Sequence, residues 1–296
     1  MDKFYSKKGE KSIMKLKRLT AVLLVAVMTL GLFACGQKEE AAEAETTEAT
    51  AEIEKPEAVS EEDWEAMQKE PVFGQEINYL FNGGACVSAK YMAEQLGYYE
   101  EYGINAKYLA GGSVVDAVAA MENGEVDASI FSDYFVIANY KEEMRAICSI
   151  TTSEEFQDEP CCVTAMNNDF IEQNPVHAKY VVKAIKRAGE YNRLNPDEAI
   201  QIMYDTDMMT GEVADQTEFW NSLHFGLSDV FTERALREIA EDYIRLGIIT
   251  KADITVDEVM DMAWTNICPD EEIDGLTVGD PVDVEGATIP VQQYEK

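Results

Sequence analysis

The stretch Glu76–Phe131, EINYLFNGGACVSAKYMAEQLGYYEEYGINAKYLAGGSVVDAVAAMENGEVDASIF, decides the fold class. Short apolar runs alternate in it with longer amphipathic runs, a pattern typical of buried strands separated by helices. Strands that alternate with helices require crossover connections, so the sequence predicts an α/β fold with a largely parallel sheet covered on both faces. The predicted strands are Glu76–Phe81, Asn105–Ala110 and Val126–Phe131, and the predicted helices are Val87–Leu96 and Val114–Asn123.

The later part of the chain is predicted to be mostly helical. Thr255 with Glu258 fits a capping box at the start of one of its helices. Prolines stand at the first-turn positions of two others, where a missing N–H costs no hydrogen bond. Two further strands, Arg145–Ile150 and Cys161–Ala165, come first. The predicted helices are Pro175–Leu194, Pro196–Tyr204, Thr232–Leu246 and Val256–Trp264.

Acidic residues dominate the composition. The chain of 296 residues has 57 Asp and Glu against 24 Lys and Arg, a formal net charge of −33. Residues 1–34 hold seven of the basic and two of the acidic residues, so the rest of the chain carries −38. Such a charge repels nucleic-acid phosphates and anionic lipid headgroups. No nucleic acid is therefore expected as a partner, and attachment to a membrane has to come from a lipid anchor.

An apolar segment near the start, Leu19–Cys35 (LTAVLLVAVMTLGLFAC), follows a basic flank at residues 15–18. A positive flank, an apolar core and small residues at its end form the layout of a secretory signal. The small residue before Cys35 resembles the lipobox of bacterial lipoproteins, in which the cysteine becomes a lipidated N-terminus. An uncleaved membrane helix is the alternative, although a span needs at least about 17 residues. We expect residues 1–34 to be a lipoprotein signal peptide, with Met14 as an alternative start.

Residues 35–70 are rich in Glu, Ala and Thr and hold few large apolar side chains. Such a segment cannot bury enough surface to offset its chain entropy. We expect lipidation at Cys35, followed by a disordered acidic tether that holds the domain off the membrane. Ser60–Lys69 is the part of it with the most helical character. The remaining residues, 71–296, suffice for one large domain or two small lobes.

Cysteine and histidine are too sparse to indicate a catalytic or metal site. His177 lies on an amphipathic helix beside Lys179 and is expected to face solvent, and His224 is the other histidine. No spacing fits a zinc site, so no metal, cofactor or catalytic residue is predicted. An odd number of cysteines after Cys35 does not fit a disulfide framework, and we expect mostly small buried side chains. They are Cys86, Cys148, Cys161, Cys162 and Cys268.

Three loops follow predicted parallel strands, at the positions where ligands collect in open α/β sheets. Each can offer backbone N–H groups and the positive end of a helix dipole. Glycines allow the backbone to approach a ligand closely, and serine, aspartate and tyrosine add hydrogen bonds and a stacking face. The alternative is that these are ordinary turns, but three in register favour a binding cleft. The loops are Asn82–Val87, Gly111–Ser113 and Ser132–Tyr134.

The same region resembles a known family. Residues Ala89–Tyr140 are similar to solute-binding proteins of nitrate/sulfonate/taurine-type and thiamine-pyrimidine-type ABC transporters, and the resemblance covers about Glu76–Trp264. The motifs that carry it are Leu-Gly-Tyr-Tyr at 96–99, Tyr-Gly-Ile at 102–104, the Gly-Gly-Ser loop at 111–113, Gly-Glu-Val-Asp-Ala at 124–128, Glu-Pro-Cys-Cys-Val at 159–163, and the Asn-Pro pairs at 174–175 and 195–196.

The resemblance implies a periplasmic-binding-protein-like fold of type II, with a small solute bound between two lobes. The chain would capture a small organic solute at the extracytoplasmic face of the cell membrane and deliver it to an ABC permease, as a lipid-anchored monomer without catalysis. Relatives usually carry one strand–helix set per lobe, whereas one set here runs directly into the later part, so the second lobe is expected to be reduced. The positions that match the family's ligand loops are Asn82, Gly84, Ala85, Cys86, Gly112, Ser113, Ser132, Asp133 and Tyr134.

The three loops contain no Lys or Arg, so an anionic solute would depend on backbone N–H groups and helix ends in a strongly negative protein. A neutral, cationic or aromatic solute is therefore favoured. One alternative function is an enzyme on the same fold that acts on a pyrimidine-like substrate through Cys86 or through Cys161 and Cys162. A related yeast pyrimidine synthase uses a longer cysteine cluster, which argues against that chemistry. Another alternative is a degenerate lobe that serves as a sensor or interaction module.

Overall fold

The computed structural model describes residues 53–81, 83–110, 114–131, 144–152, 162–273 and 276. Contacts divide the chain into two units, Met1–Ala51 and Glu52–Lys296, and all described residues belong to the second. The predicted signal peptide and the lipidation site Cys35 lie outside the described residues.

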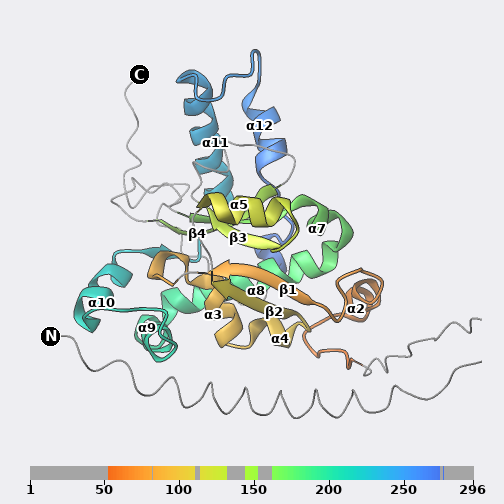
Figure 1. Cartoon of the computed structure of the whole chain (residues 1–296), viewed down its shortest axis with the longest axis vertical. Coiled ribbons are helices and arrows are strands. Elements are labelled where there is room, and N and C mark those ends of the chain that lie inside the picture. Colours follow the sequence, from red (N-terminus) through yellow and green to blue (C-terminus); the bar gives the residue numbers. More distant parts are fainter. Residues whose placement is uncertain are drawn as a thin grey trace, which may run out of the picture. The chain divides into compact units, whose positions relative to one another are not determined.

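One six-stranded sheet forms the centre of the described region (Figure 1). Its order is β2-β1-β3-β5-β4-β6, with β1 parallel to β2 and β3. The pairs β3–β5, β4–β5 and β4–β6 are antiparallel. The predicted α/β class is confirmed, but the sheet is mixed rather than largely parallel: among the strands that the structure describes, only the two pairs of β1 are parallel and the other three pairs are antiparallel. The strands are β1 (Glu76–Phe81), β2 (Asn105–Ala110), β3 (Ala128–Phe131), β4 (Met144–Thr152), β5 (Cys162–Asn167) and β6 (His224–Phe225).

The connection from β4 to β5 explains why the sheet is not parallel throughout. Only residues 153–161 separate the two strands. A parallel crossover needs about a dozen residues or more, whereas an antiparallel pair can be joined by a short loop. The reduced second lobe stays a prediction.

Helices cover both faces of the sheet (Figure 1). One core joins β1 to α3 (Ala89–Gln95), α4 (Tyr98–Glu101) and the long α8 (Pro175–Leu194). The other joins β4 and β5 to α5 (Val114–Glu122), α11 (Asp229–Arg245) and α12 (Val256–Ala263). The remaining helical elements are α2 (Glu61–Met67), η1 (Ala85–Val87), α7 (Asn168–Gln173), α9 (Pro196–Asp205), α10 (Val213–Asn221) and η3 (Asp270–Glu272).

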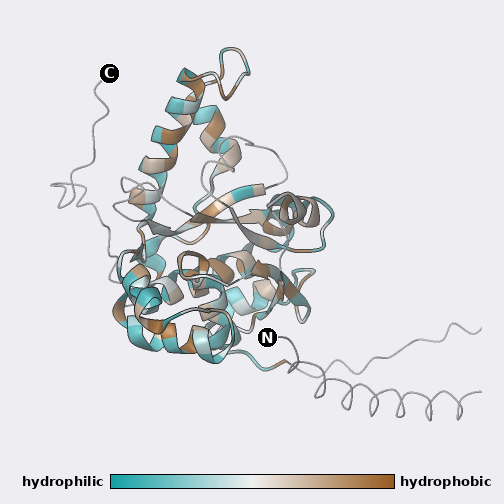
Figure 2. Cartoon of the chain, turned by 60° about the vertical axis from the view of Figure 1, so that its left-hand side comes forward, coloured by the Kyte–Doolittle hydropathy of each residue, from teal (hydrophilic) through white to brown (hydrophobic). Residues whose placement is uncertain are grey.

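The long helices carry hydrophilic and hydrophobic residues along the same ribbon, as amphipathic helices do (Figure 2). Their caps follow the sequence: Thr255 and Glu258 form the predicted capping box of α12. Helix α11 starts three residues before its predicted first residue, because the Ser228 hydroxyl accepts a hydrogen bond from the Phe231 backbone N–H at 3.0 Å. No helix in the described ranges has the length and apolarity needed to cross a membrane.

The end of the predicted tether is part of the fold, which corrects its boundary at residue 70. Helix α2 is capped by the Ser60 hydroxyl, which accepts from the Asp63 N–H at 3.0 Å. Trp64 is 6% exposed and Met67 is fully buried. Their apolar surface stabilises the folded segment, although the acidic composition around them is typical of disorder.

The predicted solvent exposure of His177 is wrong. The side chain is 2% exposed, and its Nδ1 lies 2.5 Å from Glu70 Oε2. The other two bonds of this carboxylate come from the backbone N–H groups of Val176 and His177, at 2.7 and 2.9 Å. The sequence pattern of α8 alone could not reveal this partner, because Glu70 comes from a segment expected to be a tether.

Candidate functional site

The carboxyl ends of four strands meet at one edge of the sheet. Phe81 at the end of β1 pairs in register with Ala110 at the end of β2. Strand β3 runs the same way, since Tyr79 pairs with Ala128 in parallel. Strands β3 and β4 are both antiparallel to β5, so β4 also ends here, at Thr152. We call this side the carboxyl edge and the opposite side, where these strands begin, the amino edge.

The loops predicted to bind a solute leave from this carboxyl edge. Of the predicted residues, Gly84, Ala85 and Cys86 are described by the structure. The other predicted residues lie outside the described ranges: Asn82, Gly112, Ser113, Ser132, Asp133 and Tyr134.

The loop after β1 depends on glycine. Gly83 and Gly84 have φ values of 84° and 104°, in the region that favours glycine. A Cβ on Gly83 would lie 2.5 Å from the carbonyl oxygen of Met208, and the Gly84 N–H donates to the same oxygen at 3.3 Å. The loop thus lies directly against the segment between α9 and α10.

Hydrogen bonds fix the turn η1 that follows. Thr151 at the end of β4 donates from Oγ1 to the Cys86 carbonyl at 2.9 Å. Ser88 donates to the Ala85 carbonyl at 2.8 Å and accepts from Asn192 of α8 at 2.9 Å. Ala85 is buried, Cys86 is half-buried and Gly84 is exposed. The Ala85 side chain therefore points into the protein, and Gly84 is the exposed backbone of this loop.

The residues that hold this loop in place were not predicted from the sequence. Thr151, Asn192 and Met208 come from β4, α8 and the α9–α10 connection, far from the loop in sequence. Only the pairing of β4 at the same edge brings Thr151 there, and no local motif signals it. His224 is also at this edge, because β6 pairs it with Thr152.

A buried lysine lies directly behind the loop. Lys90 of α3 is fully buried, and its Nζ donates to the Leu80 carbonyl at 2.9 Å. Desolvation holds the pKa of Lys90 well below its usual value. Lys90 is therefore held against the end of β1 and does not reach into the loop.

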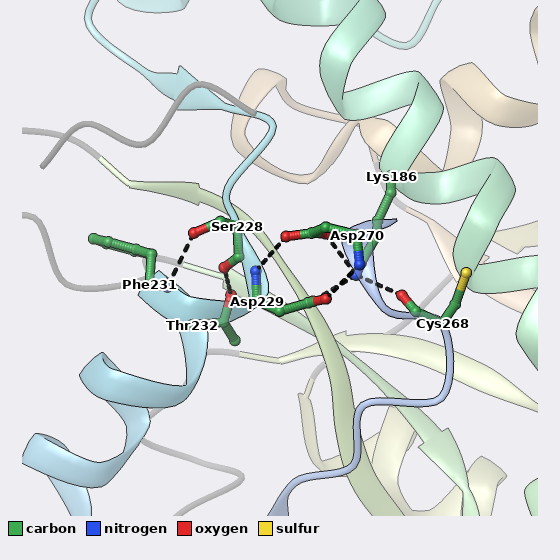
Figure 3. A network of polar contacts seen from close by, with 7 residues as sticks. All are labelled: Lys186, Ser228, Asp229, Phe231, Thr232, Cys268 and Asp270. Carbon is green, nitrogen blue, oxygen red and sulfur yellow. Dashed lines mark hydrogen bonds and ion pairs between the residues drawn. The ribbon is translucent and has the colours of Figure 1, made fainter. Parts of the chain in front are cut away.

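A second buried lysine has the opposite environment (Figure 3). Lys186 Nζ contacts Asp229 Oδ1, the Cys268 carbonyl and Asp270 Oδ1, at 2.5, 2.7 and 2.9 Å. The two aspartates also accept from each other's backbone N–H, at 2.8 and 2.9 Å. Burial alone would lower the pKa of Lys186, but attraction to Asp229 and Asp270 outweighs it and raises the pKa. The cation is stable here and joins α8 to the start of α11.

Cysteines in the described region agree with the predicted role as small buried side chains. Cys148, Cys162 and Cys268 are buried, and Cys86 is half-buried. Burial raises the pKa of the Cys148 thiol to about 12 and that of Cys268 to about 11. Within the described ranges, no three His, Cys, Asp or Glu side chains are close enough together to hold a metal ion.

A family comparison agrees with the sequence. Residues 87–162 match the family described as NMT1/THI5 like, which confirms the predicted resemblance over these residues. The matched segment runs from η1 to the start of β5 and includes two of the three predicted loops. No curated protein sequence matches the chain.

Similar solved structures have low sequence identity to the chain. The Candida albicans CA3427 gene product, described as having the generic periplasmic binding protein fold, is 12% identical, with a TM-score of 0.49 over 66% of this chain and 96% of that one. The nitrate-binding protein NrtA from Synechocystis is 11% identical, with a TM-score of 0.48 over 64% and 85%. The alkanesulfonate-binding protein SsuA from Xanthomonas axonopodis, bound to MOPS, is 8% identical, with a TM-score of 0.44 over 64% and 97%.

Proposed function

We propose, from the family match over residues 87–162 and the geometry of the carboxyl edge, that this chain is the solute-binding component of an ABC importer. It captures a small organic solute and delivers it to a membrane permease. The observation that carries the proposal is the meeting of three parallel strand ends at one edge, each followed by a predicted binding loop. Ligands bind outside the carboxyl ends of strands in open α/β sheets.

The proposed contacts are the nine predicted loop residues. Gly84 offers its exposed backbone, and Cys86 offers a half-buried side chain on a turn that Thr151 and Ser88 hold in place. A site held in this way meets a ligand without a large ordering cost. The remaining contacts come from Asn82, Gly112, Ser113, Ser132, Asp133 and Tyr134.

The proposed solute is neutral, cationic or aromatic. The three loops hold no Lys or Arg. The whole chain carries −33, so long-range electrostatics also disfavour an anion.

A thermal-shift screen of the full chain against pyrimidines, polyamines, amino acids and sulfonates tests the proposal. A compound at 100 times its Kd stabilises the folded state by about 2.7 kcal/mol, which raises Tm by several degrees. Replacement of Asp133 or Tyr134 by Ala should abolish the shift. If no compound in any class raises Tm, solute capture is the wrong function.

We further propose that Cys35 carries the lipid that keeps the protein on the extracytoplasmic face of the membrane. The acidic chain gives no basic patch for headgroups, and more than one acyl chain is needed for stable anchoring. In cells fed an alkyne fatty acid, the wild-type chain should take up label and Cys35→Ala should not. Equal labelling of the two chains would contradict lipidation at this cysteine.

A further inference from the structure

A small cavity lies between β4, the start of α3, α8 and the residues after β6. It is lined by Ala89, Ser149, Lys186, Gly189 and Gly226, among others, and has a volume of about 10 Å³. A space of this size holds one group as large as a water molecule. Ala89 follows η1 closely and Ser149 is three residues from the end of β4, so the cavity lies just behind the carboxyl edge.

Ser149 has unused hydrogen-bonding capacity. Its side chain is 8% exposed, and its Oγ has no hydrogen-bond partner among the described residues. The pairing of β4 with β5 is irregular on both sides of it, between Ala146 and Cys148 and between Ser149 and Thr151. Such irregularities re-aim side chains and are frequent beside active sites. A buried hydroxyl without a partner costs stability, so a hydrogen-bonding group placed in the cavity, from water or from a solute, would stabilise it.

The lysine of this cavity has no donor left for a ligand. All three N–H groups of Lys186 are used by Asp229, Asp270 and the Cys268 carbonyl (Figure 3). Two carboxylates accompany the one ammonium, so the surroundings of the cavity are not positive. An anionic group would gain no free cation here, whereas a neutral hydroxyl or amide could pair with the Ser149 hydroxyl.

Two glycines make the space. Gly189 on α8 faces Gly226, and a Cβ on Gly189 would lie 3.5 Å from the Gly226 N, an ordinary contact distance. Gly189 is in the interior of the twenty-residue α8, where glycine weakens a helix relative to alanine. Alanine would therefore fit, strengthen the helix and fill part of the cavity.

We propose that this cavity receives an uncharged hydrogen-bonding group of the solute and that Ser149 selects for it. The inference rests on the proposed function and narrows its solute class to molecules with a small neutral donor or acceptor at one end. Ser149 is then a binding residue that supplies the partner, and Gly189 and Gly226 supply the room.

The test compares four full-length chains in thermal-shift and calorimetric titrations: wild type, Gly189→Ala, Ser149→Ala and the control Ser222→Ala on the surface. The probes are uncharged cytosine and thymine, and charged orotate, taurine, glutamate and spermidine. We expect an uncharged probe to raise the wild-type Tm. Gly189→Ala should keep or raise the ligand-free Tm and lose that response. Ser149→Ala should keep its ligand-free Tm and weaken binding about five- to tenfold.

The outcomes distinguish a failure of the cavity proposal from a failure of solute capture. If uncharged probes bind Gly189→Ala and Ser149→Ala as tightly as wild type, the cavity has no role in binding, while solute capture stands. If only charged probes bind wild type, the solute class is wrong. If no probe binds wild type, solute capture fails and this inference fails with it. A lower ligand-free Tm for Ser149→Ala would show that the hydroxyl already has a structural partner, which overturns its role in selection.

Discussion

The two edges of the sheet differ in how their polar groups are satisfied. At the amino edge, the Glu70 carboxylate accepts two backbone N–H bonds at the start of α8 and contacts His177 Nδ1. Asn174 accepts from the Val72 N–H at 2.9 Å, and Phe73 stacks edge-on between Trp64 and His177. At the carboxyl edge, Gly84 is exposed and Ser149 has no partner among the described residues. The amino edge, whose polar groups are paired within the protein, stabilises the fold. The carboxyl edge has hydrogen-bonding groups left over and is available to a ligand.

Removal of the segment that closes the amino edge should have the largest effect. A chain that begins at residue 71 loses the buried side chains of Val59, Trp64 and Met67. We expect it to lose more than about 5 kcal/mol of stability, because large buried side chains each contribute several kcal/mol. Urea unfolding of this chain and of one that begins at residue 53 measures the difference. Equal midpoints would show that the segment is only a tether.

Gly83→Ala should destabilise the protein at the carboxyl edge. The added Cβ meets the Met208 carbonyl oxygen at 2.5 Å, and a φ of 84° is strained for alanine. We expect a loss of about 3 kcal/mol, from strain and overpacking together. Gly124→Ala is the control, since its φ is 69° but its Cβ meets nothing within 4 Å. It should lose only about 1–2 kcal/mol, and equal losses would argue against a close contact with Met208.

Glu70→Gln tests the charge at the amino edge without changing its shape. The amide keeps one acceptor oxygen but loses the charge that strengthens bonds to His177 and two backbone N–H groups. We expect a loss of about 2 kcal/mol in chemical unfolding. Glu61→Gln, with an 82% exposed side chain and a 3.6 Å ion pair, should change stability by less than about 0.5 kcal/mol. A similarly small loss of stability for both variants would show that the Glu70 charge is no more important to the fold than an exposed surface charge.

Thr151→Val should have a smaller effect on stability. It removes the hydrogen bond from Thr151 Oγ1 to the Cys86 carbonyl and keeps the side-chain volume. We expect a loss of about 1 kcal/mol. The turn η1 should become more mobile, so the solute-dependent Tm shift should shrink more than the stability does. An unchanged shift would mean that this bond does not position the site.

Alkylation should distinguish a cysteine at the carboxyl edge from a cysteine in the interior of the protein. Cys86 is half-buried at the carboxyl edge, whereas Cys148 is 2% exposed. Burial raises the pKa of Cys148 to about 12, so its thiol stays protonated and unreactive at pH 8. Mass spectrometry after treatment of native protein with N-ethylmaleimide should find Cys86 modified and Cys148 intact. Modification of Cys148 at the same rate would contradict its burial.

Local patterns predicted much of the fold. The runs at 76–81 and 105–110 are strands with the predicted bounds. Successive side chains in each run alternate between more and less exposed positions, which is the pattern of a strand. Helix α8 also has its predicted bounds, with Pro175 in the first turn. Helix α10 was not predicted, since it has no side-chain N-cap and Trp220 is its only buried residue.

Long-range contacts explain what the sequence could not show. The partner of His177 lies 107 residues away and that of Cys86 lies 65 away, so no window of the sequence contains both members of either pair. The loop after β1 was predictable from its glycines, whereas the need for glycine at position 83 comes from the distant Met208. The antiparallel half of the sheet depends on a short connection, which periodicity does not report.

Hydrogen exchange of the full chain, with and without a compound that raises its Tm, tests the central claim most directly. Solute capture at the carboxyl edge predicts slower exchange in Gly83–Ser88 and in the last residues of β4. The residues next to Glu70, just after α2, and those next to His177, at the start of α8, should exchange at unchanged rates. Protection confined to the amino edge, or no protection at η1, would contradict the account.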